Sequence, residues 1–178
     1  MRTPLTCPIP GTINPLFASN FIFSVNKLPD LTFFVQDVSL PDISLGQANY
    51  STRLSDIPVP GDKLNFGTLS VSFQIDESYK NFKALTEWIM ALGFPESNSQ
   101  YTNFIDQQEV NLSEHLKTVS DATLGILDSE MQPIAIYTFV DCFPISVSGF
   151  EVTSQTTDSN PLKATAVFAF NYFSLDTN

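Results

Sequence analysis

The stretch LNFGTLSVSFQIDESYKNFKALTEWIMALGFP, from Leu64 to Pro95, organises the fold because a strand pattern changes there into a helix pattern. Apolar residues alternate with Ser and Gln between Leu69 and Ile75, which is the two-residue period of a half-buried β-strand. From Asp76 onward, apolar residues recur at three- and four-residue steps, and Asp76 is the expected N-cap of a helix. We expect Gly93 and Pro95 to end this helix, whose apolar face would cover the preceding strand.

The composition predicts one globular domain with an acidic surface. The chain has 178 residues, of which 43% are hydrophobic, and this is enough to bury a substantial core in a single domain spanning residues 1–178. Eight Lys and Arg residues against nineteen Asp and Glu residues give a net charge of −11. This balance excludes a protein that grips nucleic-acid phosphates through a basic surface.

No residue pattern indicates catalysis, a cofactor or a metal site. His115 lies in a polar stretch without a marked nucleophile, so we expect a solvated surface histidine. Cys7 and Cys142 are far apart, and we expect both thiols to be free because the chain shows no secretory signal and is expected to be cytosolic. No stretch is long and apolar enough to cross a bilayer. We therefore expect a protein that is not an enzyme and carries no cofactor and no metal.

The first third of the chain predicts an arm, a hairpin and a connector. Residues 1–19 form a proline-rich N-terminal arm that either lies along a neighbour or stays disordered. Residues 21–25 and 31–38 are rich in Phe and Val, and the pattern predicts a β-hairpin with its turn at 26–30. Residues 40–61 are expected to form a connector that contains a short strand near 48–53. A sharp turn at 58–62 would place a loop at one end of the sheet.

The polar segment 96–120 is predicted to be a connector or insertion that contacts a partner, because long loops in compact domains are often functional. A short helix at 106–117 is the alternative for part of it.

The last third is predicted to be β again. Strands at 123–127 and 134–140 flank a turn, and Phe143-Pro144 should break the second run. A short strand at 147–153 and a final strand at 162–172 bring the expected total to seven or eight strands with one strong helix.

Trp88 is open to two interpretations. It could be a stacking platform for a base or a sugar, but on a helix with Phe82, Leu85 and Ile89 a core or interface anchor is favoured. We therefore place it among the candidate interface residues, which are Pro58, Val59, Pro60, Gly61, Trp88, Phe94, Tyr101 and Phe104.

The order of these features along the chain resembles that in a known family. The segments that carry the resemblance are 20–25 (NFIFSV), 31–36 (LTFFVQ), 38–41 (VSLP), 57–64 (IPVPGDKL), 69–76, 88–95 (WIMALGFP), 121–124 (DATL), 139–146 (FVDCFPIS) and 164–173. In this order they resemble the tail-tube-fold proteins of contractile-tailed bacteriophages (myoviruses), and most of all the tail completion and sheath-stabilising proteins that terminate the tube. The resemblance covers nearly the whole chain after Asn20.

The resemblance implies a mainly β fold with one flanking α-helix, built as an antiparallel β-barrel or two-sheet sandwich. It also implies a virion protein, assembled in the host cytoplasm, that forms a hexameric ring around a channel. DNA would pass through this channel without specific binding, and the neighbours would be tail tube, sheath and neck proteins. The main tube subunit and a baseplate-proximal tube initiator share this architecture and remain alternatives. A β-barrel that binds a small ligand in an aromatic cavity is the alternative from a different class.

Overall fold

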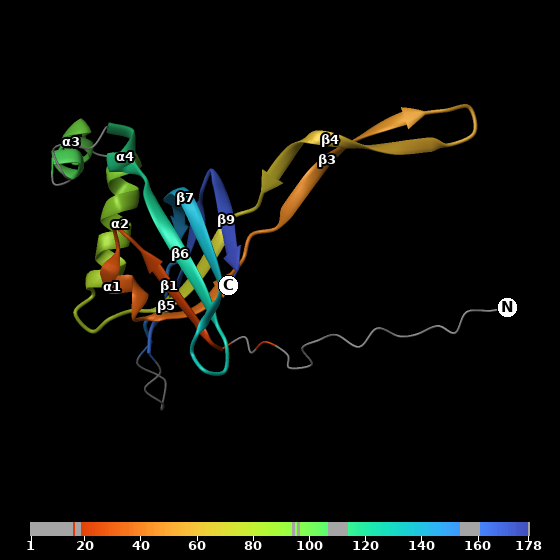
Figure 1. Cartoon of the computed structure of the whole chain (residues 1–178). Coiled ribbons are helices and arrows are strands. Elements are labelled where there is room, and N and C mark those ends of the chain that lie inside the picture. The colour runs from red at the N-terminus through yellow and green to blue at the C-terminus, as the bar shows by residue number, and fades with distance from the viewer. Residues whose placement is uncertain are drawn as a thin grey trace.

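The computed structural model describes residues 16, 19–93, 95, 97–106, 114–153 and 161–177. Helices lie on one side of a strongly twisted β layer, and one long hairpin projects away from the other side (Figure 1). The strands are β1 (Phe21–Val25), β2 (Val35–Ser39), β3 (Ile43–Ser51), β4 (Asp56–Phe66), β5 (Leu69–Gln74), β6 (Ser120–Leu127), β7 (Pro133–Val147), β8 (Lys163–Ala169) and β9 (Tyr172–Thr177). The helices are α1 (Pro29–Thr32), α2 (Lys80–Gly93), α3 (Asn98–Asp106) and α4 (Glu114–Thr118).

Strand β7 belongs to two antiparallel sheets. It pairs with β6 on one side up to Cys142 and with β9 on the other side up to Val140, whereas Phe143 to Val147 pair with β8. The strand order is β1-β6-β7-β8-β5-β2, and β9 joins at β7. Strands β1 and β2 lie at the two ends of this order. Within the described residues they do not pair with each other, so the continuous strand order stays open between them. The prediction of a mainly β, antiparallel fold with a flanking helix is confirmed, in a two-sheet form without a closed barrel.

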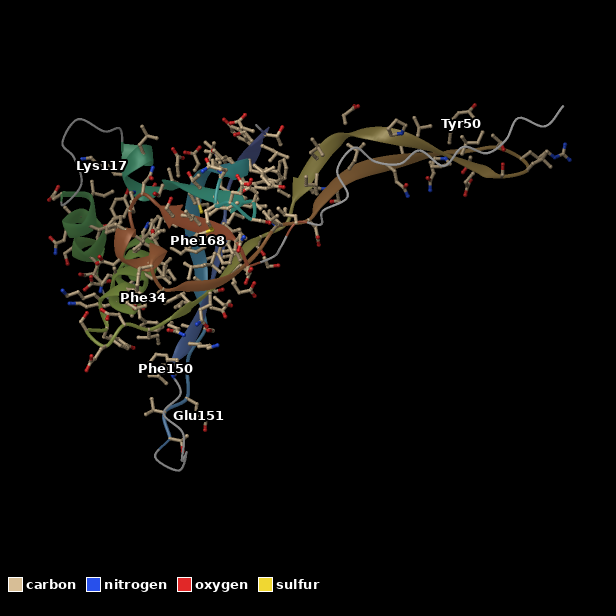
Figure 2. The ribbon with its side chains drawn as sticks, turned by 60° about the horizontal axis from the view of Figure 1, so that its bottom comes forward. Phe34, Tyr50, Lys117, Phe150, Glu151 and Phe168 are labelled. Atoms are coloured by element: carbon tan, nitrogen blue, oxygen red, sulfur yellow. The ribbon has the colours of Figure 1, made fainter. Side chains whose placement is uncertain are left out.

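The core lies between the sheets and α2. On β5 the side chains of Leu69, Val71 and Phe73 are fully buried and the residues between them are half-buried, which confirms the predicted two-residue period. Helix α2 covers the open side of the sheets with Leu85 and Trp88. Figure 2 shows Phe168 among the other side chains of this interior.

The start of α2 differs from the prediction. The helix begins at Lys80 rather than after Asp76, because Tyr79 has a φ of 61° and its N–H donates to the Asp76 carbonyl in a tight turn (N···O 2.8 Å). The Asp76 carboxylate instead accepts a hydrogen bond from the Ser78 hydroxyl, and this bond lowers the pKa of Asp76 below its ordinary value. The prediction of Asp76 as helix cap is wrong, whereas the helix end at Gly93 is confirmed.

Asn81 connects β5 to α2. Its side chain is 2% exposed, its Nδ2 donates to the Gln74 carbonyl (2.8 Å), and its Oδ1 accepts from the Phe82 N–H (2.7 Å). A buried amide with its donor and acceptor both used fixes the angle between strand and helix. No pattern in the sequence indicated this role.

The predicted hairpin of residues 21–25 and 31–38 is wrong. Strand β1 pairs with β6, and β2 pairs with β5, so the two strands lie at opposite ends of the strand order. The short helix α1 separates them, with Pro29 at its first turn and Leu31 in the core. The pairing of β1 with β6 is favoured over a local hairpin because it buries Phe23 and Val25 in the core.

The prediction of a connector at 40–61 is also wrong, because β3 and β4 form a long two-stranded hairpin, although the short strand predicted near 48–53 overlaps the outer part of β3. Pro58 and Pro60, expected in a turn, lie inside β4. Pro58 and Pro60 are two residues apart, so their backbone nitrogens point to the same edge of the strand. In the described chain β4 pairs only with β3, which leaves its other edge free. Both prolines therefore fit where their missing N–H groups face the outer edge of the hairpin.

Gly61 makes a close backbone approach inside this hairpin. A Cβ atom on Gly61 would lie 2.6 Å from the carbonyl oxygen of Gly46, at the point where the β3–β4 register shifts between Leu45 and Gln47. Only glycine fits here without a movement of the backbone.

In the last third of the chain, the hairpin predicted from 123–127 and 134–140 is confirmed as β6 and β7. The predicted break at Phe143-Pro144 is wrong, since β7 continues to Val147 with a register shift between Pro144 and Ser146. The segment after it is not the predicted strand. Instead, the Phe150 ring packs against the rings of Tyr79 and Phe82 (centroid distances 6.1 and 5.3 Å), near the start of α2.

The predicted final strand at 162–172 is divided into β8 and β9 at Asn171, whose N–H donates to the Val140 carbonyl (3.0 Å). In the polar segment, α3 ends where the alternative helix at 106–117 was expected to begin, α4 covers the end of that range, and residues 107–113 lie outside the described part. Most of the predicted N-terminal arm, 1–15 and 17–18, lies outside it as well.

We predict that Gly61→Ala loosens the β3–β4 hairpin without affecting the core. The new methyl group would collide with the Gly46 carbonyl, and the backbone shift should cost about 1–3 kcal/mol locally. Hydrogen-exchange mass spectrometry should show faster exchange in peptides from 43–66 and unchanged exchange in β5 and β8. Gly93→Ala is the control, because no atom lies within 4 Å of its Cβ position. Unchanged exchange in 43–66 would contradict the close approach.

We predict that Trp88→Ala lowers the free energy of unfolding by about 3–5 kcal/mol, because the indole is 1% exposed and its Nε1–H donates to the Thr118 carbonyl (3.0 Å). Urea denaturation measures this change. Trp88→Phe keeps part of the apolar contact but loses the hydrogen bond and part of the ring volume, so its cost should be smaller, about 1–3 kcal/mol. A Trp88→Ala protein as stable as the wild type would place the side chain outside the core.

Candidate interaction surfaces

The β3–β4 hairpin exposes apolar side chains along its whole length. Near the core they are Ile43, Leu45 and Leu64, which are 53–57% exposed and which we call the base patch. Farther out they are Tyr50, Ile57 and Val59, which are 44–67% exposed and which we call the tip patch. Figure 2 shows Tyr50 far from the interior that holds Phe168. Contiguous exposed apolar side chains of this kind mark surfaces that another molecule covers.

The two patches lie on either side of an irregularity in the ribbon. Cross-strand pairs are apolar on both sides of it, as in Leu45↔Leu64 and Tyr50↔Ile57, but the register shifts between Leu45 and Gln47. A register shift of this kind bends and twists a pair of strands. The base and tip patches therefore form two separate stretches of the hairpin surface.

A groove lies between the two free sheet edges. It has a volume of about 340 Å³ and is lined by apolar residues from four parts of the chain: Leu16 of the N-terminal segment, Phe21 on β1, Val38 and Leu40 on and after β2, and Leu124 and Ile126 on β6. Asn20 and Asp37 contribute polar groups. We call it the seam groove, because it follows the line where β1 and β2 fail to meet. An open sheet edge beside an apolar groove is a site where another chain can dock.

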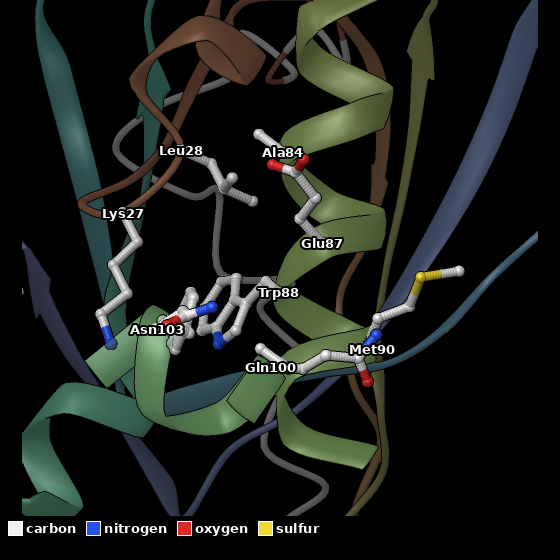
Figure 3. Close-up of a pocket in the computed structure, with 10 residues that line it drawn as sticks. Lys27, Leu28, Ala84, Glu87, Trp88, Met90, Gln100 and Asn103 are labelled. Carbon is white, nitrogen blue, oxygen red and sulfur yellow. The ribbon is translucent and has the colours of Figure 1, made fainter. Parts of the chain in front are cut away.

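A second cavity, of about 390 Å³, lies between α2, α3 and the residues after β1 (Figure 3). Lys27 reaches across it, with Nζ 5.4 Å from the centroid of the Trp88 ring and 5.7 Å from that of Phe104. The ammonium group also donates to the carbonyls of Leu116 and Lys117 on α4. Burial lowers the pKa of Lys27 to about 8. Lys27 thus ties the helices to β1, and the described part of the cavity shows no nucleophile beside this amine.

The other groups considered for chemistry offer no reactive site in the described residues. Cys142 is free and buried, and burial together with the Asp121 charge raises the pKa of its thiol to about 12. The side chain of His115 and all of Cys7 lie outside the described residues. Among the described side chains no cluster of His, Cys, Asp or Glu could hold a metal ion. No helix in the described chain is long and apolar enough to cross a membrane.

The predicted interface residues fall into two regions. Pro58, Val59, Pro60 and Gly61 lie in the outer half of β4, and Val59 belongs to the tip patch. Trp88, Tyr101 and Phe104 lie on α2 and α3, where Trp88 is buried and the other two are half-buried. Phe94 lies outside the described residues. Their role in an interface stays a prediction.

The base patch, Tyr50 and the seam groove were not predicted from the sequence. The alternation of Ile43 and Leu45 was a signal for the base patch, but the prolines obscured the strand.

We predict that Trp88 fluorescence titrates with Lys27. Trp88 is the single tryptophan, and the adjacent ammonium should lose its proton near pH 8. Lys27→Met should abolish this transition. In the unfolded chain Lys27 keeps its proton up to about pH 10.4. Between about pH 8 and 10 the unfolded state therefore binds more protons than the folded state, so the free energy of unfolding of the wild type should rise relative to that of Lys27→Met. Emission from the wild type that stays flat across this transition would contradict the contact.

Solved structures with the same fold come from contractile injection systems. A chain of the anti-feeding prophage baseplate matches with a TM-score of 0.64 and 13% identity, over 93% of this chain and 98% of that one. The tube-terminating cap of the anti-feeding prophage matches with a TM-score of 0.60 and 13% identity, over 99% and 100% of the two chains. A chain of the sheath-tube complex of the extracellular contractile injection system PVC matches with a TM-score of 0.58 and 14% identity, over 93% and 94%. These likenesses establish the fold.

The sequence itself establishes the family. No curated protein matches the chain significantly. The sequence profile of phage tail tube proteins, however, matches residues 8–176, which is nearly the entire chain. The chain with the projecting hairpin and the open sheet seam is therefore a member of the phage tail tube protein family.

Proposed function

We propose that the chain forms a closed ring, a hexamer, in a contractile phage tail. As a tail tube family member it is a structural protein of the virion tail and not an enzyme. The observation that carries the ring is the β3–β4 hairpin, which stands away from the core with its apolar residues exposed (Figure 1). A lone two-stranded hairpin is marginally stable in water, so neighbouring copies must cover it. Free edges at β1 and β2 offer further surface for subunit contacts.

Within the tail, we place the ring at the head-proximal end, where it terminates the tube and anchors the sheath. The resemblance of nearly the whole chain after Asn20 to tail completion and sheath-stabilising proteins supports this position. The partners would be the tail tube, the sheath and the neck proteins, and assembly would take place in the host cytoplasm. The main tube subunit and the baseplate-proximal initiator are the alternatives.

The surface chemistry supports a channel through which DNA passes without specific binding. The chain has few cations and a net charge of −11, so DNA phosphates would find few binding groups. In the sheet formed by β1, β6, β7 and β9, cross-strand pairing places four hydroxyl side chains in one row: Ser24, Thr123, Thr138 and Ser174. In β1 and β6 the residues on either side of this row are buried. A row of neutral hydroxyl groups presents no charge that would trap a phosphate.

The experiment is the size and shape of purified protein, measured by mass photometry and negative-stain electron microscopy. We expect rings that do not stack further. Long tubes would contradict the terminator position and favour the main tube subunit. A monomer at high protein concentration would contradict the ring and favour the small-ligand alternative.

The hairpin variant Tyr50→Ser/Val59→Ser should stay folded and form rings at least roughly tenfold more weakly, because two exposed anchors are lost. Met131→Ser is the matched control, since Met131 is 64% exposed but lies in the turn between β6 and β7. Rings of the double variant that are as stable as wild-type rings would contradict the role of the hairpin.

A further inference from the structure

The turn at the end of the β3–β4 hairpin is held by hydrogen bonds and presents an apolar side chain. The Thr52 N–H donates to the Ser55 carbonyl (3.0 Å), and the Ser55 N–H donates to the Thr52 Oγ1 (3.2 Å). Between these residues, Leu54 is 95% exposed. A turn held in this way can bury Leu54 in a partner without a large loss of conformational freedom.

The seam groove has the complementary shape and chemistry. Its volume of about 340 Å³ accommodates a leucine side chain, and its floor includes Leu124, which is 3% exposed. Asp37 lies at this groove on the free strand β2 and is exposed. The groove therefore combines an apolar interior with a negative charge.

Arg53 at the tip and Asp37 at the groove carry opposite charges, and the other charged residue of the tip, Asp56, accepts a hydrogen bond from the Ser51 hydroxyl (2.6 Å). Arg53 is adjacent to Leu54, is exposed, and is the one cation in the outer half of the hairpin, residues 47–60. Within the described residues, neither Arg53 nor Asp37 has an ion pair. Opposite charges at matching positions of two surfaces guide association and fix its register.

The hairpin cannot reach the groove of its own chain. Strands β3 and β4 contain 9 and 11 residues and lead straight away from the core (Figure 1). At about 3.3 Å per residue the tip is carried roughly 30 Å outward. A hairpin tip that occupies this groove would therefore belong to another copy. A contact between two different surfaces of identical chains closes into a ring when its rotation permits.

We propose that the hairpin tip of one copy docks in the seam groove of a second copy, with Leu54 in the groove and Arg53 paired with Asp37 of that second copy. This inference rests on the ring proposed above and specifies which surfaces join its subunits. The tip patch is continuous with the docked turn and extends the same contact.

The experiment uses charge reversal in the full chain. Arg53→Asp alone places two carboxylates at the contact, and Asp37→Arg alone places two guanidinium groups there. Each variant should remain folded, since both residues are exposed, and each should need a roughly tenfold higher protein concentration to form rings. Leu54→Ser should weaken rings in the same way.

The decisive measurement is an equimolar mixture of Arg53→Asp and Asp37→Arg. In a ring where the two variants alternate, every second contact would join the introduced carboxylate at the tip to the introduced guanidinium at the groove. The remaining contacts would join the native Arg53 to the native Asp37, so every contact is attractive. We expect the mixture to form rings at the wild-type concentration. The double variant Lys63→Asp/Asp37→Arg is the control, because it reverses the other cation of the hairpin, leaves Arg53 facing the introduced guanidinium, and should assemble as poorly as Asp37→Arg alone.

The outcomes separate this inference from the ring itself. Rings that tolerate either reversal, or a mixture that assembles no better than its components, would overturn the docking and leave the ring intact. A wild-type protein that stays monomeric would overturn the ring, and the docking with it.

Discussion

Strand β7 changes partners along its length, and this change shapes the whole molecule. Up to Val140 the strand pairs with β9, and from Phe143 it pairs with β8, so one continuous backbone holds both sheets. Asp141, between these segments, has a φ of 55°, and its carboxylate accepts a hydrogen bond from Asn171 Nδ2 (2.7 Å) at the β8–β9 connection. The change of partners in β7 therefore fixes where the two sheets separate and how large a core α2 has to cover.

In this architecture the core side chains are buried and their polar atoms are hydrogen-bonded, whereas the proposed assembly surfaces keep apolar side chains exposed. Phenylalanines and aliphatic residues from both sheets and α2 are buried together, and every buried side-chain polar atom in the described residues has a partner. By contrast, the β3–β4 hairpin and the seam groove expose apolar groups that the isolated chain cannot cover. Folding of one chain thus creates surfaces whose burial requires further copies, which couples the stability of the hairpin to assembly.

Local patterns predicted local structure well. The β6–β7 hairpin, the period of β5 and the end of α2 at Gly93 each depend on residues close in sequence. The predicted pairing of β1 with β2 failed because both strands find partners far along the chain, such as Phe23↔Leu124. The hairpin at 43–66 was missed because prolines two residues apart indicate a turn unless both nitrogens face a free edge.

Composition and periodicity, which are properties of the chain alone, were enough to predict an acidic protein with many strands and a strand-to-helix core. The resemblance to tail tube proteins came separately, from the order of particular segments along the chain. Sequence patterns indicated the outer half of β4 as a candidate interface, but they indicated neither Leu54 nor Asp37. The separation of β1 from β2, and the groove formed by the apolar groups between them, became visible only in the folded chain. Such surfaces arise from pairing between distant strands, whose energies depend on the packing of the whole core and not on any local stretch.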